Sequence, residues 1–302
     1  MGKIAFVFAG QGAQHPGMGK ELAEISDAAA EVFKTADQIR PGTSAQCFEG
    51  TDEELKKTDN TQPCMYAVEM AAAAALTEKG IKADMTAGFS LGELAALTYS
   101  GAADLESGFR LVCKRGQLMQ QAAEKQDTSM AAVLKLTPEK VEEVCAGFEN
   151  VYPVNYNCPG QISVSGDAAE MKAFRGAVKE AGGRAIPLKV SGAFHSPFMK
   201  EAGDAFAEEI KKFDFGKPGC ALYSNCTGEE YGDDVKKSLS DQMCSPVRWE
   251  KIIRNMIDAG ADTFIELGPG NTLAGFISKI NSDVRVFSVE GKEDLETVVS
   301  EV

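Results

Sequence analysis

TAGFSLGE, at residues 86–93, is the stretch that decides the fold, because an apolar strand pattern gives way to a helical one inside it. Ser90 stands there between Gly88 and Gly92. Glycines lack a Cβ atom, so a strand and a helix can meet in a sharp, strained turn that exposes the serine hydroxyl. The first amides of the following helix, expected over 91–99, would face the place where an oxyanion forms. The stretch therefore predicts a nucleophile elbow in an α/β protein.

Length and composition predict an ordinary globular protein. The chain has 302 residues, of which 44% are hydrophobic, so it can bury a large core in one large domain or two unequal ones. The longest apolar run, residues 71–76, is far too short to span a bilayer, and the N-terminus enters a strand pattern without a cleavage site. We therefore expect a cytoplasmic protein that has no membrane partner.

Charge and cysteine usage exclude several further classes of function. The net charge of −14 disfavours nucleic acids and anionic membranes as partners, because both are bound by clustered positive charge. The eight cysteines form no C-x-x-C pair and have no neighbouring histidine. This spacing indicates neither a metal site nor a disulfide framework, and we expect reduced thiols and no bound metal.

Helical and strand patterns alternate along the chain, which predicts a largely parallel sheet. An apolar strand at 3–8 is followed by a glycine-rich loop at 9–19 and a helix at 20–38. The same reading places further elements as follows: a helix at 61–79, a strand at 84–89, a helix at 247–259, a strand at 262–266, and a last helix opened by Gly268-Pro269-Gly270.

A different pattern occupies the middle of the chain. It predicts strands at 130–136, 151–156, 161–165 and 184–189, with helices at 138–146 and 168–181. This order is that of the ferredoxin-like split motif. We therefore expect a ferredoxin-like subdomain at 128–190, inserted into a discontinuous, α/β-hydrolase-like catalytic domain made of 1–127 and 191–302.

A serine nucleophile needs a base, and the chain offers two histidines, His15 and His195. His195 lies where the insert rejoins the large domain, and Ser196-Pro197 after it is typical of a helix start. We expect His195 in the cleft between the domains. An α/β-hydrolase would carry its histidine near the C-terminus, whereas more than 100 residues follow His195 here. Since no acidic partner is evident, a backbone carbonyl or an amide side chain would set its tautomer.

The glycine-rich loop at 10–19 does not match a nucleotide-binding motif. It lacks the third glycine of a dinucleotide fingerprint and the hydroxyl residue of a P-loop. Its glycines could let the amide of Gln11 approach an oxyanion, with the amide of Leu91 as second donor, each worth roughly 3 kcal/mol. A plain cluster of turn glycines is the alternative.

Arg115 lies in a predicted helix over 109–120. Arg110 and Lys114 share one helix face, whereas Arg115 is rotated by about 100° toward the side of Leu111 and Leu118. An arginine directed inward requires an anion, and we favour a bidentate clamp for a substrate carboxylate. A solvated surface arginine is the alternative.

Together these residues resemble the malonyl-CoA:acyl-carrier-protein transacylase family of fatty-acid synthesis, and the match extends over nearly the whole chain. Several blocks in order are far more specific than the elbow alone. The matching blocks are FAGQGAQHPGMG (8–19), GFSLGE (88–93), RGQLMQ (115–120), NYNCPGQISVSG (155–166), VSGAFHSPFM (190–199), SPVRW (245–249) and ELGPGNTL (266–273).

The resemblance implies a ping-pong transfer from malonyl-CoA to the phosphopantetheine thiol of an acyl carrier protein, with no permanently bound cofactor. It makes Ser90 the nucleophile, His195 the general base and acid, and Arg115 the ligand of the malonyl carboxylate. The resemblance also assigns supporting roles: Gln11 and Leu91 as oxyanion donors, Asn157 as a polar residue beside the histidine, and the main-chain carbonyl of Gln242 as the group that orients the imidazole.

The chain departs from the family at one position beside the nucleophile. Phe89 stands where the family usually has a histidine. Phe194, before the catalytic histidine, is similar to the malonyl-selecting form of related acyltransferases, in which an aromatic ring leaves little room for an α-methyl group. Met119, Met130 and Phe198 could line an adaptable acyl pocket or belong to the core.

Partners and competing functions follow from the same resemblance. The family's carrier proteins are acidic, so basic residues are candidates for the docking surface, namely Arg184, Lys189, Lys200, Lys279 and Arg285. We expect a discrete, monomeric enzyme. The alternatives are a serine thioesterase or esterase that uses Ser90 and His195 with water as acceptor, and a non-catalytic scaffold that retains the elbow.

Overall fold

The computed structural model describes residues 2–188, 190, 192–232 and 234–302, and it contains two separate sheets. The larger sheet has five strands in the order β7-β2-β1-β8-β9, and every neighbouring pair is parallel. Its strands are β1 (Lys3–Phe8), β2 (Met85–Gly88), β7 (Ala221–Tyr223), β8 (Ala261–Leu267) and β9 (Arg285–Val289). The parallel sheet expected from the alternating pattern is therefore confirmed.

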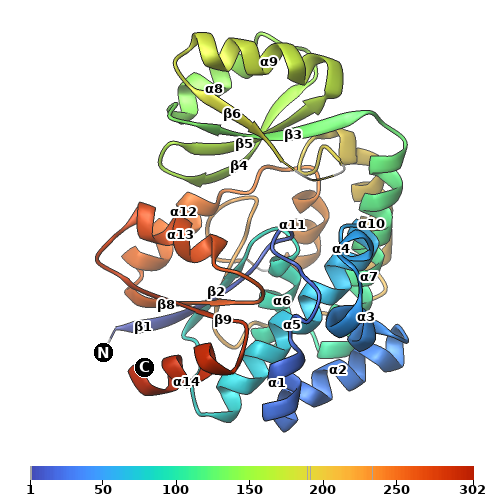
Figure 1. Cartoon of the computed structure of the whole chain (residues 1–302), viewed down its shortest axis with the longest axis vertical. Coiled ribbons are helices and arrows are strands. Elements are labelled where there is room, and N and C mark those ends of the chain that lie inside the picture. The colour runs from blue at the N-terminus through green and yellow to red at the C-terminus, as the bar shows by residue number, and fades with distance from the viewer. Residues whose placement is uncertain (1, 189, 191, 233) are drawn as a thin grey trace.

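Helices cover both faces of this sheet (Figure 1). Alternation along β1 explains how: Phe6 and Phe8 pack into one hydrophobic cluster, whereas Ala5 and Val7 pack into a second cluster with Trp249. The helices and one 3-10 turn of this part are α1 (Lys20–Ile25), α2 (Asp27–Ile39), α3 (Thr43–Glu49), α4 (Asp52–Leu55), α5 (Thr58–Glu78), α6 (Gly92–Tyr99), α7 (Leu105–Glu124), η1 (Pro197–Met199), α10 (Lys200–Ile210), α11 (Val235–Gln242), α12 (Trp249–Asp258), α13 (Thr272–Ile280) and α14 (Lys292–Glu301).

The single helix expected at 20–38 is wrong, because the structure divides it into α1 and α2 at Ser26. Ser26 has extended backbone angles, and its hydroxyl accepts a hydrogen bond from the Ala29 amide at 3.1 Å. A serine that caps a helix offers the backbone an alternative to continuing the preceding one. The apolar periodicity runs across this break, so periodicity alone does not reveal it.

The second sheet lies above the first in Figure 1 and is antiparallel, in the order β4-β5-β3-β6. Its strands and helices, β3 (Thr128–Leu134), α8 (Pro138–Cys145), β4 (Val151–Cys158), β5 (Gln161–Asp167), α9 (Ala168–Glu180) and β6 (Arg184–Pro187), follow the ferredoxin-like order. They share a separate hydrophobic cluster around Phe174 and Val164. We propose 128–190 as the subdomain and 1–127 with 191–302 as the large domain.

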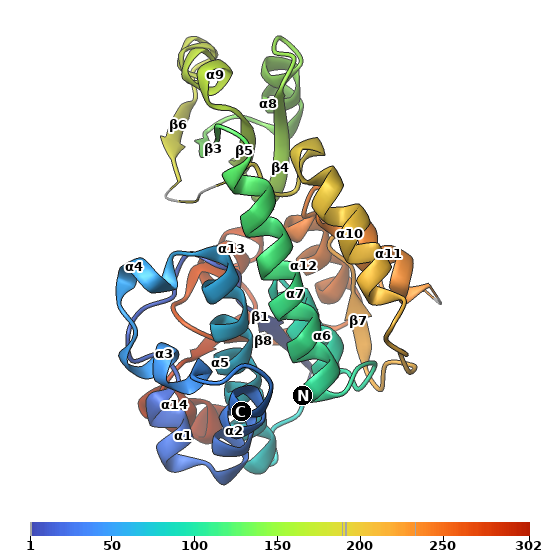
Figure 2. The same ribbon diagram turned by 90° about the vertical axis from the view of Figure 1, so that its right-hand side faces the viewer.

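The two sheets are joined where a site would be expected. Helix α7 leads upward into β3 (Figure 2), and Val247 bonds to β4 through the Tyr156 amide at 2.9 Å and the Val154 carbonyl at 2.8 Å. Strands β1 and β2 are parallel neighbours, so their carboxyl ends meet at one edge of the sheet, below this junction. Such an edge is the usual place for a site in an α/β sheet. None of the described helices has the length and apolarity that a bilayer crossing requires.

Candidate active site

The turn after β2 has the geometry that its glycines predict. Ser90 adopts a left-handed backbone conformation with φ of 57°. A Cβ atom on Gly88 would lie 1.9 Å from the Gly92 carbonyl carbon, and one on Gly92 would lie 2.4 Å from the Phe8 carbonyl oxygen. Only glycine fits at either position, because both neighbours are backbone atoms. The strained turn of the nucleophile elbow is therefore held by contact on both sides.

Asn225, which follows β7, holds the elbow from below. The Ser90 amide donates to its Oδ1 at 2.8 Å, and its Nδ2 donates to the Gly88 carbonyl at 2.6 Å. The sequence reasoning missed this residue. Its position in the topology is what could have revealed it. Strand β7 is the neighbour of β2, so a polar residue that follows β7 lies at the same end of the sheet as Ser90.

Ser90 and His195 lie within hydrogen-bond distance of each other. Ser90 Oγ is 2.6 Å from His195 Nε2, and His195 Nδ1 is 3.0 Å from the Gln242 carbonyl oxygen. The carbonyl can only accept, so Nδ1 carries the proton and Nε2 has a free lone pair. Burial lowers the pKa of His195 to about 4, and the nearby charge of Arg115 lowers it further. The imidazole is therefore neutral at physiological pH and can act as a base toward the serine.

Arg115 is 1% exposed and points toward the nucleophile. Its Nη2 donates to Ser90 Oγ at 3.2 Å and to Gln242 Oε1 at 2.7 Å, and its Nη1 donates to Gln62 Oε1 at 2.9 Å. Its buried Nε has no partner among the described residues. Burial lowers its pKa to about 10, with Glu93 opposing that shift, so the group stays charged at neutral pH. A cation with an unused N–H beside the serine can bind an anionic substrate group.

Glu93 and the Gln242 side chain form a buried support beneath this centre. Gln242 Nε2 donates to the Ser90 carbonyl and to Glu93 Oε2, each at 2.6 Å. Glu93 Oε1 accepts from the Tyr231 hydroxyl at 2.6 Å and from the Asn225 amide at 3.1 Å. Burial raises the pKa of Glu93 to about 7, although these hydrogen bonds and Arg115 oppose the rise. The sequence reasoning included the Gln242 carbonyl but missed the role of both side chains.

The amides of Gln11 and Leu91 accompany Ser90 at the ends of two neighbouring strands. Gln11 follows β1, and Leu91 directly precedes α6. Within the described parts of the chain, neither amide donates to an acceptor. Amides left free at this edge match what an oxyanion hole requires.

A cavity of about 260 Å³ opens above these groups, between the large domain and the second sheet. Its lining includes Ser90, His195, Phe194, Met130 and Asn157. Asn157 does not bond to the imidazole, because its Nδ2 donates to Ser163 Oγ at 3.2 Å.

Three of the residues predicted to bind the substrate or to line its pocket, Arg115, Met119 and Phe198, are not among those that line this cavity. Met119 is buried behind it, where its sulfur contacts Gln62 Nε2 at 3.2 Å. Phe198 packs against Tyr152, with the ring centroids 6.2 Å apart.

The candidate carrier-binding cations lie in different places. Lys279 is close to the cavity, since its Nζ is 3.5 Å from Gln161 Oε1 and Gln161 lines the cavity. Arg184 is exposed at the start of β6, and Lys200 pairs with Asp204. Arg285 begins β9, at the sheet edge opposite to the site. Lys189 lies outside the described residues.

Nowhere among the described residues do three or more His, Cys, Asp or Glu side chains gather as potential metal ligands. All eight cysteines are free, and four of them are buried.

Comparison with known proteins agrees with this geometry. The family model of the acyl transferase domain matches residues 5–295. The malonyl CoA-acyl carrier protein transacylase of Bacillus subtilis strain 168 is 39% identical over 307 residues, which cover 99% of this chain and 97% of that protein. The same-named protein of Staphylococcus aureus strain MSSA476 is 39% identical and covers 98% of both chains.

Solved structures give the same result. The crystal structure of malonyl CoA-acyl carrier protein transacylase from Clostridium perfringens Atcc 13124 superposes with a TM-score of 0.96 at 40% identity, covering 99% of this chain and 96% of that one. A malonyl-transacylase in complex with its type II polyketide-synthase acyl-carrier protein gives 0.95 at 32% identity, covering 99% and 100%. The chain belongs to the acyl transferase domain family, among the malonyl-CoA:acyl-carrier-protein transacylases.

Proposed function

We propose that the enzyme transfers a malonyl group from malonyl-CoA to the phosphopantetheine thiol of an acyl carrier protein through a malonyl ester on Ser90. The observation that carries this mechanism is the Ser90–His195 contact of 2.6 Å beside a buried arginine with an unused N–H. The transfer supplies the extender unit for fatty-acid synthesis.

In the first half-reaction, Ser90 Oγ attacks the thioester carbonyl while His195 Nε2 takes the serine proton. The carbonyl π electrons move to oxygen, and the amides of Gln11 and Leu91 donate to this oxyanion. When the intermediate collapses, the C–S bond breaks and the proton on Nε2 passes to the sulfur. Coenzyme A leaves, and malonyl-Ser90 remains.

The second half-reaction reverses these steps with a different thiol. The carrier's phosphopantetheine thiol gives its proton to His195 Nε2 and attacks the ester carbonyl, and the same two amides hold the oxyanion. The Ser90 oxygen then leaves and recovers the proton. Thioester and ester are close in free energy, so concentrations set the direction of transfer.

Arg115 is the proposed clamp for the malonyl carboxylate. Its free Nε–H and its Nη2 lie on one edge of the guanidinium, so a carboxylate that takes the place of Ser90 Oγ on Nη2 would be bound by both nitrogens. Ion pairing there would orient the ester and keep it from a hydrolytic geometry. Phe194, with its ring in the cavity wall, is the proposed residue that disfavours an α-methyl group.

The remaining proposals concern partners and location. We place the carrier on the basic rim formed by Lys279 and Arg184, treat the enzyme as a monomer that keeps no bound cofactor, and place it in the cytoplasm. The eight free cysteines are in keeping with a reducing compartment. Charge reversal of Lys279 that leaves the apparent KM for the carrier unchanged would remove that residue from the docking surface.

Intact-protein mass spectrometry tests the proposed function. Wild type and Ser90→Ala are incubated briefly with malonyl-CoA, and a phosphopantetheinylated carrier protein is then added. We expect a malonyl adduct on the wild type only, which is discharged onto the carrier. An adduct lost to water at the same rate without carrier would instead indicate a thioesterase, and no adduct at all would contradict the role of Ser90.

A further inference from the structure

The glycine-rich loop that carries Gln11 is attached to the rest of the protein at few points. Ala9 still bonds to β8, through the Leu267 carbonyl at 3.1 Å, and Gly17 donates to the Cys47 carbonyl at 2.9 Å. Between them, the Gly12 amide donates to Gln14 Oε1 at 2.6 Å, within the loop itself. Among the described residues, the hydrogen bond that joins residues 10–16 to another segment is that of His15 with Glu290.

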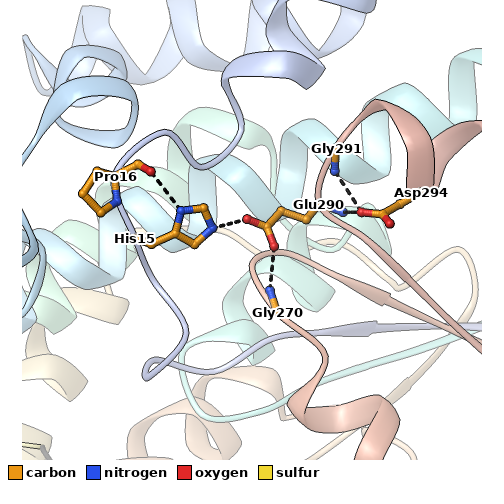
Figure 3. Close-up of polar contacts among 6 residues, drawn as sticks. All are labelled: His15, Pro16, Gly270, Glu290, Gly291 and Asp294. Atoms are coloured by element: carbon orange, nitrogen blue, oxygen red, sulfur yellow. Dashed lines mark hydrogen bonds and ion pairs between the residues drawn. The ribbon is translucent and has the colours of Figure 1, made fainter.

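Glu290 lies just after β9 and connects two loops at the site (Figure 3). Its Oε1 contacts His15 Nε2, and its Oε2 accepts from the Gly270 amide at 2.9 Å. The two loops also touch directly, because a Cβ atom on Gly270 would lie 2.9 Å from the Ala13 Cβ. Ala13 and Pro269, one from each loop, line the cavity above Ser90. The carboxylate therefore ties together two walls of the active site.

The imidazole of His15 faces an acceptor on each side. Its Nδ1 is 2.9 Å from the Pro16 carbonyl oxygen, and its Nε2 faces the Glu290 carboxylate (Figure 3). A neutral imidazole has one N–H only, so it can satisfy one of these acceptors but not both. The imidazolium donates to both. The geometry therefore fits the protonated form of His15.

We propose that His15 and Glu290 are positioning residues that hold the Gln11 amide in the oxyanion hole, and that this hold weakens when His15 loses its proton. The inference rests on the proposed function, because it assigns a purpose to the placement of Gln11. An oxyanion donor must be held within about 0.5 Å of its productive position. Neither residue contacts the reacting atoms.

The charges around the pair set the direction of its pH dependence. Partial burial lowers the pKa of His15, but the hydrogen bonds to Pro16 and Glu290 and the negative charges of Glu290 and Asp52 outweigh it, so the pKa is raised. On the far side, Asp294 accepts from the Glu290 amide at 3.1 Å, and Glu21 accepts from the Lys292 amide at 3.2 Å. A raised pKa means that the pair is complete at low pH and is lost as pH rises through that value.

Rapid-quench malonylation of Ser90 tests the proposal, combined with hydrogen exchange of the peptide that covers residues 10–16. The variants are His15→Ala and Glu290→Gln. The control is Lys34→Ala, which removes an exposed ion pair with Glu31 on α2. His15→Lys is the rescue variant, because it keeps a positive charge that does not titrate near neutral pH.

At pH 6.5 we expect His15→Ala and Glu290→Gln to slow malonylation roughly 10-fold with little change in KM, since a displaced donor costs less than a deleted one. Exchange over 10–16 should rise in both variants and stay at the wild-type level in Lys34→Ala. The wild-type advantage over His15→Ala should shrink toward pH 9. His15→Lys should restore the rate and remove this part of the pH dependence.

The outcomes separate this inference from the proposed function. If His15→Ala is malonylated at the wild-type rate across the pH range, the inference is overturned, whatever the hydrogen exchange of residues 10–16 shows. The proposed function would then still stand, provided that the wild type forms malonyl-Ser90. If the wild type forms no adduct, the proposed function fails, and the link between Gln11 and the reaction fails with it. Unchanged hydrogen exchange in both variants would also overturn the inference.

Discussion

The two segments that are proposed to supply the oxyanion donors are held in place by different means. The elbow around Ser90 and Leu91 is held by backbone contacts at its glycines and by hydrogen bonds with the side chains of Asn225 and Gln242. The loop around Gln11 is held to other segments by a His15–Glu290 pair whose histidine side chain is 46% exposed. The elbow is therefore fixed by backbone contacts and hydrogen bonds, whereas the proposed hold on the loop depends in part on a contact that solvent and pH can change.

The two histidines of the chain show the same contrast. Burial keeps His195 neutral and lowers its pKa, whereas neighbouring carboxylates favour the charged form of His15. A base must be neutral to accept a proton, and a clamp between two acceptors must be charged. In the two proposed roles, one residue type serves two purposes, and its surroundings decide which.

The largest effect is expected from Gly88→Ala on the elbow side. The added Cβ would overlap the backbone of Gly92 at 1.9 Å, so we expect a loss of stability on the order of 3 kcal/mol or more and no active serine. Gly12→Ala on the loop side meets no atom within 4 Å and should cost only about 1 kcal/mol, through its φ of 131°. Urea unfolding and serine labelling by a fluorophosphonate measure both quantities.

Gly176→Ala in α9 is the matched control, because a Cβ there meets nothing within 4 Å. Alanine favours a helix more than glycine does, so this variant should be up to about 1 kcal/mol more stable. Wild-type labelling of Gly88→Ala would show that the elbow tolerates a side chain and would remove the contrast with the loop.

Arg115→Ala should lower the rate of Ser90 malonylation by roughly 100- to 1000-fold, because a buried, charge-assisted contact with the carboxylate is lost. Acetylation from acetyl-CoA should change far less, since acetyl lacks the carboxylate. The control is Arg110→Ala on the same helix, where the side chain pairs with Glu106 in solvent. If Arg115→Ala keeps its preference for malonyl over acetyl donors, the clamp assignment fails.

The pH dependence of serine labelling should report the protonation of His195. His195 has its pKa lowered to about 4, so labelling by a neutral fluorophosphonate should stay constant as pH falls from 7 and drop only near pH 4. Arg115→Gln should move this loss of labelling to higher pH, because the substitution removes a positive charge that lowers the pKa of His195. Burial should still keep that pKa below its ordinary value of about 6.5. A loss of labelling between pH 6 and 7 in the wild type would contradict the assignment of His195 as a buried, neutral base.

The free energy of unfolding should also depend on pH through the two histidines. Between about pH 6.5 and 4, the unfolded chain protonates His195 and the folded chain does not, so this group contributes stability that is lost as pH falls. His15 acts in the opposite direction, because its raised pKa stabilises the fold below about pH 6.5 and that contribution is lost as pH rises.

The smallest effect is expected from Phe89→His. The Phe89 ring packs against Trp249 and Phe276, with centroids 5.4 and 6.4 Å apart, and a Cβ on Gly10 would lie 2.8 Å from it. Losing this aromatic packing should cost about 1 kcal/mol, with less than a threefold change in malonylation. Phe148→His, which removes a comparable pair with Phe174 in the second sheet's cluster, is the control for thermal unfolding. A tenfold slower reaction in Phe89→His would show that this ring, too, positions the loop.

Local sequence patterns were sufficient for much of the fold. The elbow, the parallel sheet and the ferredoxin-like order depend on spacing within a few residues, which periodicity reports. The division at Ser26 was missed because a cap competes with a helix without changing its apolar pattern.

The supporting contacts of the site could not be predicted in the same way. Asn225 bonds to Ser90 across 135 positions and Glu290 contacts His15 across 275, so no local pattern connects them. The proposed base, His195, could be chosen because the chain has two histidines and one of them lies where the insert rejoins the large domain, and the resemblance to a family supplied the Gln242 carbonyl. Roles that need a third or fourth partner, such as those of Glu93 and Gln62, become visible only when the chain is folded.

The order of strands in the parallel sheet has a consequence for how the enzyme is made. β1 pairs with β8, which is the second-last strand of the parallel sheet to leave the ribosome. The strands of the second sheet, by contrast, are complete by Pro187. Nascent chains tend to fold domain by domain as their residues emerge. We therefore expect the inserted unit to fold during translation, whereas β1 can complete its pairing only after residues 261–267 have been made. Until then, the nascent chain exposes the apolar side chains of β1, which a chaperone would bind.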